Sequence, residues 1–483
     1  MRVVAGNDER GPLVSASIVV AATALLTLTI WSPLPELDVT IVAGMIIVSA
    51  MAHRALLAWR NLLTLLIVVI MFIPVRRYTL PASLPFALEP YRVLVALVVV
   101  MWICALLIDP RVRYRKSGLG GPIGLYIAGV FASLVVNGAR VSSLSTYVAK
   151  SLTFFISFLF VFGLIISVAR PEMLDWLLKW LVISGAIVGA FAVQEARTGY
   201  NVFNHLSHYV PFLRMEQLPD EQGRGERLRA IASAEHAIAL SALLVMLIPM
   251  AFYLCRRTGK RIWLLPAAVM AVGSFSTVSR TGFVMLVVVA VQYARMRWTD
   301  VKRYWPVIVP VLAVVHLMLP STLGSLVTSF FPKGGLVAEQ QASKGTRGSG
   351  RIADLGPSLK EWGRKPIFGE GFGTRITDWG HENAPILDDQ WLGTMLETGA
   401  VGALGVLLTF LRVLKRLKIA ARADDTPRGW LYVGLSASIS AFAVGMITYD
   451  AFAFVQVTFL FWFLLAFAAV ALRGSSAANL AQA

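Results

Sequence analysis

Long apolar runs alternate with short polar segments along almost the whole chain. Since about 20 consecutive apolar residues cross a bilayer as a helix, runs approaching this length predict membrane-spanning helices. The pattern predicts an all-α polytopic membrane protein with about 12–14 transmembrane helices. The predicted helices lie at 13–30, 38–52, 60–75, 91–108, 121–136, 151–168, 177–193, 237–255, 262–276, 282–296, 305–320, 391–411, 430–447 and 453–472.

Two long polar stretches interrupt this pattern and divide the chain into parts. The parts are N-terminal helices at 1–193, a loop at 194–236, helices at 237–320, a large loop at 321–390 and C-terminal helices at 391–483. In the large loop, apolar residues recur at helical spacing, which predicts a short amphipathic helix with Pro357 expected to kink it. These apolar residues are Ile352, Leu355, Leu359 and Trp362.

Lysine and arginine gather between alternate helices, and this bias predicts the orientation of the chain. Short cytoplasmic loops of membrane proteins carry an excess of these two residues. The basic clusters lie at 111–116, 256–261, 295–303 and 412–428. Placing them in the cytoplasm puts both termini on the same side. The two long loops, 194–236 and 321–390, then face outward.

Composition agrees with a membrane protein and excludes other classes. The chain is 57% hydrophobic and 15% charged, and its mean hydropathy is +0.70. Its net charge of +17 is explained by the loop clusters and by anionic lipid headgroups, so we expect no nucleic-acid partner. Cys104 and Cys255 lie in or at the end of apolar runs, without metal-binding or redox spacing.

Two groups of arginines are candidates for binding an anion at the outer face. Arg280 lies in the polar sequence Ser279 to Gly282 between two apolar helices, where a charge costs about 3 kcal/mol unless it is paired or reaches water. Arg227 and Arg229 precede the helix at 237, and a guanidinium fork matches phosphate oxygens. The alternatives are a snorkelling arginine at a helix end for Arg280, and a solvated basic loop for Arg224.

A third group of candidate site residues lies at the polar, C-terminal end of the large loop. Three glycines, Gly369, Gly371 and Gly373, allow tight turns or close approach of the backbone. His381 is a candidate proton acceptor, and acidic groups near it are candidates for orienting it or binding sugar hydroxyls. These polar residues are Glu382, Asn383, Asp388 and Asp389, and Arg351 joins the candidate anion-binding residues. Asp388 and Asp389 are alternatively caps of the helix that follows.

A succession of short motifs resembles the O-antigen ligase and polymerase superfamily of bacterial envelope glycan assembly. The motifs are RAIASAEH at 229–236, SRTG at 279–282, GRIADLGPSLKEW at 350–362, PIFGEGFG at 366–373 and DDQWLGTMLETGAVGALG at 388–405. The resemblance extends over roughly 224–410, and the N-terminal half matches only as a set of apolar helices. The family often has adjacent histidine and asparagine, whereas Glu382 stands between His381 and Asn383 here.

The resemblance implies a GT-C-like, metal-independent glycosyltransferase of the bacterial inner (plasma) membrane, working without a cofactor on its outer face. Its donor would be a glycan on a polyprenyl diphosphate, and its acceptor a glycan or glycolipid hydroxyl. Carried over by motif, Arg229 and Arg280 would neutralise the diphosphate. His381 would be a base or would position the acceptor. Ligase and polymerase share these motifs, so the resemblance does not separate them.

Two other interpretations make different demands on the sequence. A transporter or flippase for a lipid-linked glycan would place charged residues along a path through the bilayer, but the predicted helices are nearly free of charges. A metal-dependent enzyme of this fold would place acidic residues in the first outer loop. Glu36 and Asp38 lie there, in a loop of only a few residues. Asp450, between the last two predicted helices, is a candidate for the site of either the enzyme or the transporter, and alternatively caps a helix.

Overall fold

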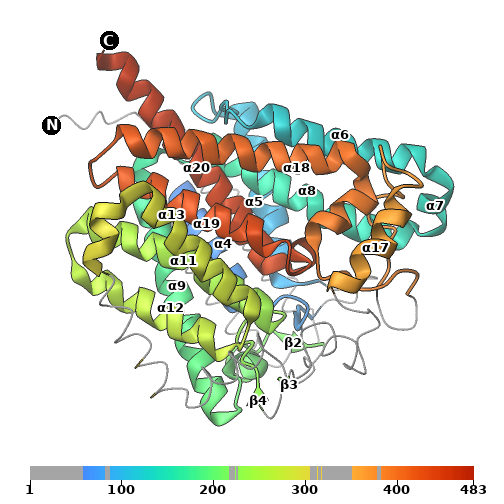
Figure 1. Ribbon diagram of the computed structural model, residues 1–483, viewed down its shortest axis with the longest axis horizontal. Helices are drawn as coiled ribbons and strands as arrows, with labels where there is room; N and C mark the ends of the chain where they lie inside the picture. Colours follow the sequence, from blue (N-terminus) through green and yellow to red (C-terminus); the bar gives the residue numbers. More distant parts are fainter. Residues whose placement is uncertain are drawn as a thin grey trace, which may run out of the picture.

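The computed structural model describes residues 58–81, 88–216, 223–224, 227–304, 313, 317, 351–377 and 382–482. The predicted helices at 13–30 and 38–52, and almost all of 305–320, lie outside these residues. The described part is almost entirely helical, as the apolar pattern predicted, so the chain is an all-α polytopic membrane protein (Figure 1).

The helices follow the predicted order. They are α4 (Trp59–Phe72), α5 (Pro90–Ile108), α6 (Gly120–Val136), α7 (Gly138–Ser143), α8 (Ser145–Val168), α9 (Pro171–Thr198), α10 (Leu206–Tyr209), α11 (Ala237–Thr258), α12 (Leu264–Ser276), α13 (Arg280–Tyr304), α17 (Arg351–Trp362), α18 (Gln390–Ala423), α19 (Gly429–Gly445) and α20 (Val455–Gln482). Most ends are shifted by a few residues, but α13, α18 and α20 continue to residues 304, 423 and 482, well past their predicted ends at 296, 411 and 472. Short 3-10 turns lie at Val202–His205, Arg261–Trp263 and Ala451–Ala453. The amphipathic helix predicted in the large loop is α17, which contains Pro357.

Six helices in the described part of the chain are long and apolar enough to cross a membrane: α5, α8, α9, α11, α18 and α20. Four shorter apolar helices accompany them, at Trp59–Phe72, Gly120–Val136, Arg261–Ser276 and Gly429–Gly445. α8 begins at Ser145, before the predicted start at 151, because the helix continues through a polar first turn that apolar run length alone does not detect.

α20 forms the centre of the bundle. Its segment Val455–Arg473 is apolar on all sides, and the membrane-length window within it is completely buried. A helix without a polar face must be surrounded by other helices. α8, α11, α18 and α19 pack around it, with Phe461 of α20 stacked on Phe442 of α19 at 4.4 Å between ring centroids.

α6 and α18 lie side by side in the closest helix contact of this region (Figure 1). A Cβ atom added to Gly129 of α6 would lie 2.6 Å from the Cα of Gly402 of α18. One turn along, a Cβ on Gly405 would lie 2.6 Å from the Cα of Tyr126. Small residues let helix backbones approach this closely in membranes, so these glycines fix the position of α18 against α6.

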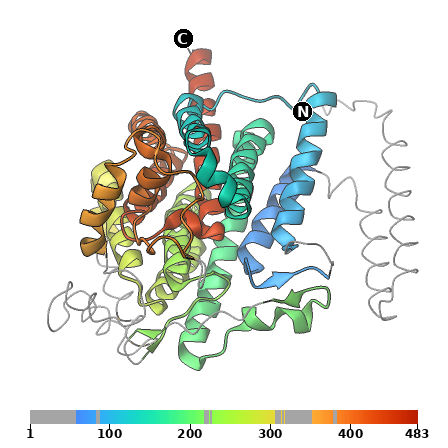
Figure 2. The ribbon, with the colours of Figure 1, turned by 90° about the vertical axis from the view of Figure 1, so that its right-hand side faces the viewer.

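Short strands lie at the end of the bundle opposite the C-terminus (Figure 2). β1 (Tyr78–Thr79) pairs antiparallel with β2 (Arg214–Met215), so the segment after α4 is joined to the segment after α10. β3 (Gly223–Arg224) and β4 (Arg227–Leu228) form a second antiparallel pair. The segment after α4 and the loop 194–236 therefore lie at the same end of the molecule.

Candidate active site

A kink in α18 creates the framework of the site. Gly399 has φ 65° and ψ −166°, a backbone conformation that only glycine adopts readily, and it divides α18 into two segments. The segment 366–373 packs against this kink through backbone hydrogen bonds. Ala400 donates its amide to the Pro366 carbonyl at 2.8 Å, and Glu370 donates its amide to the Leu396 carbonyl at 2.8 Å. The backbone groups that the kink frees are thus paired with the PIFGEGFG motif.

The three glycines of this motif have the roles that the sequence predicted. Gly369, Gly371 and Gly373 have φ values of 67°, 119° and 70°, all in the left-handed region. A Cβ on Gly369 would lie 2.5 Å from the Leu396 carbonyl oxygen, and one on Gly373 would lie 2.6 Å from the Cβ of Ser151. The prediction of tight turns or close backbone approach is confirmed: all three have left-handed backbones, and Gly369 also lies against the backbone of Leu396 and Glu397, whereas the nearest atoms at Gly371 and Gly373 belong to the side chains of Thr374 and Ser151.

The N-terminal half of the chain holds the motif from its other side. Asn137, directly before α7, donates its side-chain amide to the Gly369 carbonyl at 3.0 Å. Its amide oxygen accepts a hydrogen bond from the Lys365 ammonium at 2.6 Å. Arg140 forms an ion pair with Glu370 at 2.7 Å. The motif therefore has a fixed position between α18 and the α6–α7 corner.

A cavity of about 240 Å³ lies beside this framework. Its walls come from α8, the segment after Phe372, the start of α18 and the turn at 450–453. Much of the lining is aromatic, contributed by Tyr126, Tyr147, Phe154, Phe155, Phe158, Phe372, Phe452 and Trp462. Arg76, two residues before β1, also lines the cavity, so the cavity lies near the strand pair of β1 and β2.

Charged groups of both signs line the cavity. The cations are Arg76, Lys150 and Arg375, and the acidic residues are Asp389, Glu397 and Asp450. Burial and the neighbouring Asp388 carboxylate raise the pKa of Asp450 to about 7, although Arg76 and Arg375 oppose the shift. A carboxyl group that titrates near neutral pH is suited to accept a proton from a substrate hydroxyl.

Arg76 is held at the cavity wall by contacts with three other parts of the chain. Its φ of 65° is rare for a residue with a side chain. The Glu89 carboxylate accepts a hydrogen bond from the Arg76 amide at 2.8 Å. The Arg76 guanidinium donates to the Ala453 carbonyl at 3.2 Å and lies 3.3 Å from the Glu235 carboxylate. These contacts maintain a strained backbone, which fixes a positive charge near Asp450.

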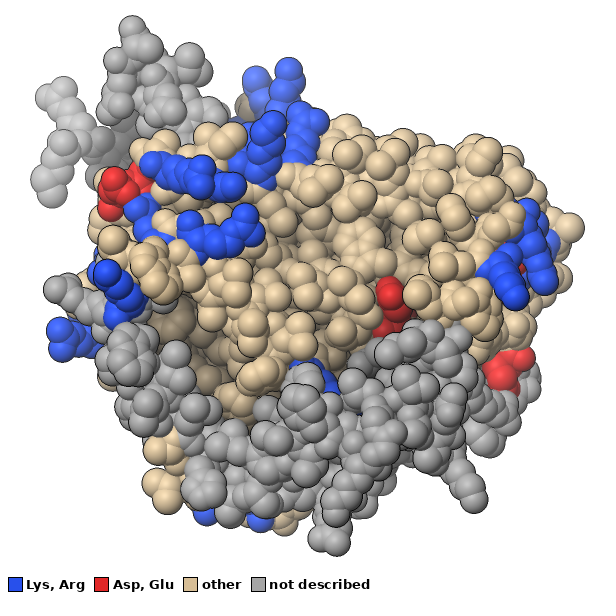
Figure 3. Space-filling view, in the orientation of Figure 1, with Lys and Arg blue, Asp and Glu red and all other residues tan. Residues whose placement is uncertain are grey.

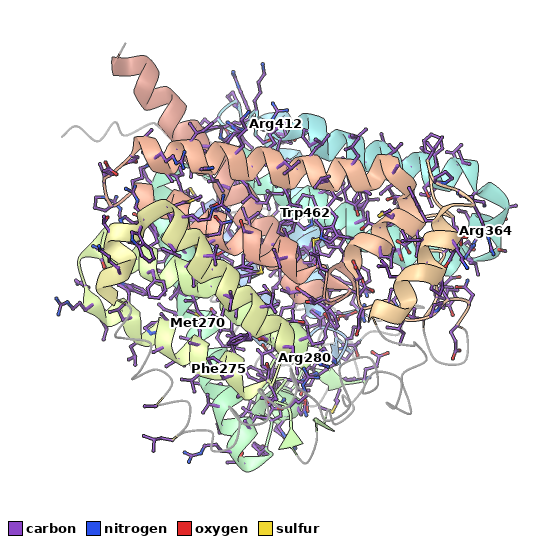
Figure 4. All side chains as sticks on the ribbon, in the orientation of Figure 1. Met270, Phe275, Arg280, Arg364, Arg412 and Trp462 are labelled. Carbon is purple, nitrogen blue, oxygen red and sulfur yellow. The ribbon has the colours of Figure 1, made fainter. Side chains whose placement is uncertain are left out.

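A second polar group lies at the N-terminus of α13 (Figure 4). Arg229 donates from Nε to the Thr277 carbonyl at 2.9 Å, so the loop that carries Arg229 contacts the turn before Arg280. The turn was predicted at 279–282, but α13 already begins at Arg280, so the turn lies before that residue. Ser279 Oγ accepts a hydrogen bond from the Gly282 amide at 3.3 Å, and this contact starts the helix at Arg280.

The segment between α19 and α20 connects the two groups. Thr448 donates its hydroxyl hydrogen to Thr281, the second residue of α13, at 2.9 Å. On the other side, Gln390 donates its amide to the Met446 carbonyl at 2.8 Å and accepts from the Phe452 amide at 2.6 Å. The cavity and the α13 N-terminus are therefore neighbours across one short segment, although neither Arg229 nor Arg280 lines the cavity.

The other predicted site residues have different environments. Asp389 lines the cavity and also caps α18, because its carboxylate accepts from the Leu392 amide at 3.1 Å. Asn383 holds the backbone of the loop, accepting from the Ile376 amide at 2.8 Å and donating to the Thr374 carbonyl at 2.9 Å. Asp388 is exposed, near enough to Asp450 to raise its pKa.

The structure describes little or nothing of the side-chain contacts of the four remaining predicted residues. Glu382 is half-buried at the start of the loop 382–389. Arg227 lies in β4 and Arg351 starts α17, but their side chains lie outside the described part of the structure. His381 lies outside the described residues altogether.

The structure adds four charged residues that the sequence analysis did not identify: Arg76, Lys150, Arg375 and Glu397. Arg76 lies in the sequence PVRRYT, which reads as an ordinary basic helix flank. Lys150 lies at the edge of an apolar run, and Arg375 directly follows the glycine motif. Arg375 is paired with Glu361 of α17, which connects the amphipathic helix to the cavity wall. Among the described residues, no group of three or more His, Cys, Asp or Glu side chains is placed to hold a metal ion.

The fold and the site define a multi-pass, all-α membrane protein with a polar cavity at one end of its helix bundle. Residues 265–407 match the family described as O-antigen ligase. The match confirms the predicted relation to the O-antigen ligase and polymerase superfamily, and it includes the α13 N-terminus, the glycine motif and the kink of α18. It indicates a glycosyl-transfer enzyme, a membrane glycan ligase or polymerase that uses lipid-linked glycans. No curated protein matches the chain.

Proposed function

We propose that this protein transfers a glycan from a polyprenyl diphosphate to an acceptor hydroxyl, with inversion at the anomeric carbon and without a metal ion. The acceptor oxygen forms a bond to the anomeric carbon while the bond from that carbon to the diphosphate oxygen breaks. The lipid diphosphate leaves with the electron pair, and the acceptor proton passes to a base. The barrier to this step is lowered most by groups that stabilise the departing negative charge.

The contact between the Arg229 loop and the turn before Arg280 is the observation that supports this proposal most directly. It brings two arginines from separate loops to the N-terminus of α13, a helix of 25 residues. The first amides of a helix carry partial positive charge and bind phosphate groups. Together with the two guanidinium groups, they would stabilise a departing diphosphate without a metal ion.

The neighbouring cavity suits the acceptor and the transferred sugar. It has room for a small polar group, and its carboxylates can accept hydrogen bonds from hydroxyl groups. Asp450 is a candidate base because its pKa of about 7 lets it accept and release a proton at neutral pH. His381, the base candidate from the sequence, competes with Asp450 for this role.

The predicted orientation fits the same proposal. Arg76, which lines the cavity, lies two residues before β1, and the strands lie at the end of the bundle opposite the C-terminus (Figure 2). The basic residue clusters predict a cytoplasmic C-terminus. We therefore place the reaction on the outer face of the bacterial inner membrane, with both chain termini in the cytoplasm.

The test is turnover by purified protein in detergent that contains a chelator. The substrate is a polyprenyl-diphosphate-linked oligosaccharide, supplied with and without a second glycan or glycolipid as acceptor. We expect release of lipid diphosphate together with a longer or newly attached glycan. The product separates polymerase from ligase. Removal of one stabilising charge typically lowers kcat by about 10²–10³-fold, and we expect this loss in Arg229→Gln and Arg280→Gln.

Arg364→Gln is the matched control. Arg364 carries the same charge as Arg229 and Arg280, but it is exposed where they are half-buried, and it lies beside α17 and away from Arg280 (Figure 4). This variant should keep its activity within about two-fold, as surface substitutions usually do. Equal losses in all three variants would contradict a specific diphosphate site. Movement of the donor across liposomes without cleavage would instead support a transporter.

A further inference from the structure

A second hollow lies between α6 and α18 and shares no lining residue with the cavity of the candidate active site. It has a volume of about 440 Å³ and is lined by Gly121, Pro122, Leu125, Leu408, Leu411, Arg412 and Lys415. Apart from Arg412 and Lys415, all of these residues are nonpolar. The hollow begins one turn beyond the contact of Gly405 with Tyr126, so it continues the line along which the two helices touch. We call it the α6–α18 groove.

Two cations close one end of the α6–α18 groove. The Arg412 guanidinium lies over Gly121, where an added Cβ would be 3.9 Å from Arg412 Nη1. Arg412 and Lys415 are both exposed. Within the described part of the chain, neither makes a hydrogen bond or ion pair. Arg416, one turn further on, is already engaged, because it donates to the Ser117 carbonyl at 3.0 Å.

No acidic residue on α18 balances these charges. Between Glu397 and Asp424 the helix has five cations and no carboxylate; the cations are Arg412, Lys415, Arg416, Lys418 and Arg422. Figure 3 shows lysine and arginine gathered at the edge of the molecule where Figure 4 labels Arg412. The α6–α18 groove therefore combines an apolar floor with uncompensated positive charge at one end.

We propose that the α6–α18 groove binds an anionic phospholipid. An acyl chain would lie along Pro122, Leu125 and Leu408, and the phosphate would lie between Arg412 and Lys415. A soluble anion would gain nothing from the apolar floor, and a neutral lipid would leave the two cations uncompensated. The groove matches a molecule that is apolar along its length and anionic at its head.

Lipid binding here would also stabilise the helix pair that frames the candidate active site. α6 holds the glycine motif through the residues at its C-terminal end, and α18 begins at the cavity. A ligand that binds only the folded state raises the free energy of unfolding by RT ln(1 + L/Kd), where L is the concentration of free ligand. Bound lipid would therefore support the spacing of α6 and α18 beyond their glycine contacts.

The experiment measures binding of phosphatidylglycerol to the full-length protein in detergent by native mass spectrometry. Phosphatidylcholine with the same acyl chains is the neutral comparison. Each basic residue near an anionic lipid contributes roughly a five-fold gain in binding, so Arg412→Gln/Lys415→Gln should weaken phosphatidylglycerol binding about 30-fold. It should hardly change the weak binding of phosphatidylcholine.

Lys260→Gln/Arg261→Gln is the charge-matched control. It also removes two exposed cations from a segment predicted to face the cytoplasm, the connection between α11 and α12, and should leave binding within about two-fold. Leu408→Trp fills the floor without changing charge and should also weaken binding. Equal loss in the control, or wild-type binding by the Arg412/Lys415 double variant, would overturn the proposal.

Discussion

Replacing Gly129 by alanine tests the helix contact that holds α18 in place. The new Cβ would lie 2.6 Å from both the Cα and the amide nitrogen of Gly402, and both are backbone atoms that cannot rotate away. α6 and α18 would have to separate, and overpacking of this kind costs about 1–3 kcal/mol. Alanine also favours a helix over glycine by about 0.5–1 kcal/mol, which offsets part of that cost.

Gly124→Ala is the control, because it isolates the packing cost. Gly124 lies in the same helix, and a Cβ there would meet no heavy atom within 4 Å. The gain in helix propensity is common to both variants and cancels in their comparison. The difference in unfolding free energy between them is therefore the packing cost, about 1–3 kcal/mol.

Thermal unfolding of both variants in one detergent gives this comparison directly. Gly124→Ala should unfold at or slightly above the wild-type midpoint, and Gly129→Ala clearly below it. If Gly129→Ala unfolds at or above Gly124→Ala, α6 and α18 do not approach as closely as described. The position of the glycine motif would then need another explanation.

Two further predictions concern the site itself. Gly399→Ala should destabilise the protein by at least about 2 kcal/mol and abolish transfer, because its Cβ would collide with the Ile367 carbonyl in a glycine-only conformation. Gly356→Ala has open space inside α17, so it should leave turnover unchanged and thermal stability unchanged or slightly raised. If the Asp450 carboxylate is the base, kcat/KM should rise with pH through about 7, and Asp450→Asn should lack this rise. Since the raised pKa disfavours the ionised form in the folded protein, Asp450→Asn should gain more thermal stability at pH 8 than at pH 5, and equal gains would contradict the shift.

The sequence predicted most of the fold, because membrane helices are defined by the length of apolar runs. The described helices lie where those runs are. The glycines of PIFGEGFG were also predictable, since three glycines at alternate positions are typical of backbone turns. The sequence named Arg229 and Arg280 as candidates on the same outer face, and their approach to the α13 N-terminus is known only from the hydrogen bond between Arg229 and Thr277.

Other features of the site depend on tertiary contacts that no local pattern reveals. Gly399 lies in a run that reads as one continuous helix, and its kink is stabilised by a segment about thirty residues earlier. Arg76 reads as a basic helix flank, and only its contacts with Glu89 and Ala453 place it at the cavity. Asp389 was given two interpretations, and the structure combines them, because the residue caps α18 and lines the cavity.

The arrangement around Gln390 suggests how donor and acceptor would be kept in register. The backbone and side chain of Gln390 hold the segment 446–452 against the start of α18, and Thr448 holds the same segment against the start of α13. In the proposed reaction, the diphosphate lies on the α13 side of this segment and the acceptor on the α18 side. A misplacement of about 1 Å between reacting groups can cost 10²-fold in rate. A short segment with hydrogen bonds on both sides is a more precise spacer than a free loop, which gives the glutamine of the DDQW motif a physical role beyond starting a helix.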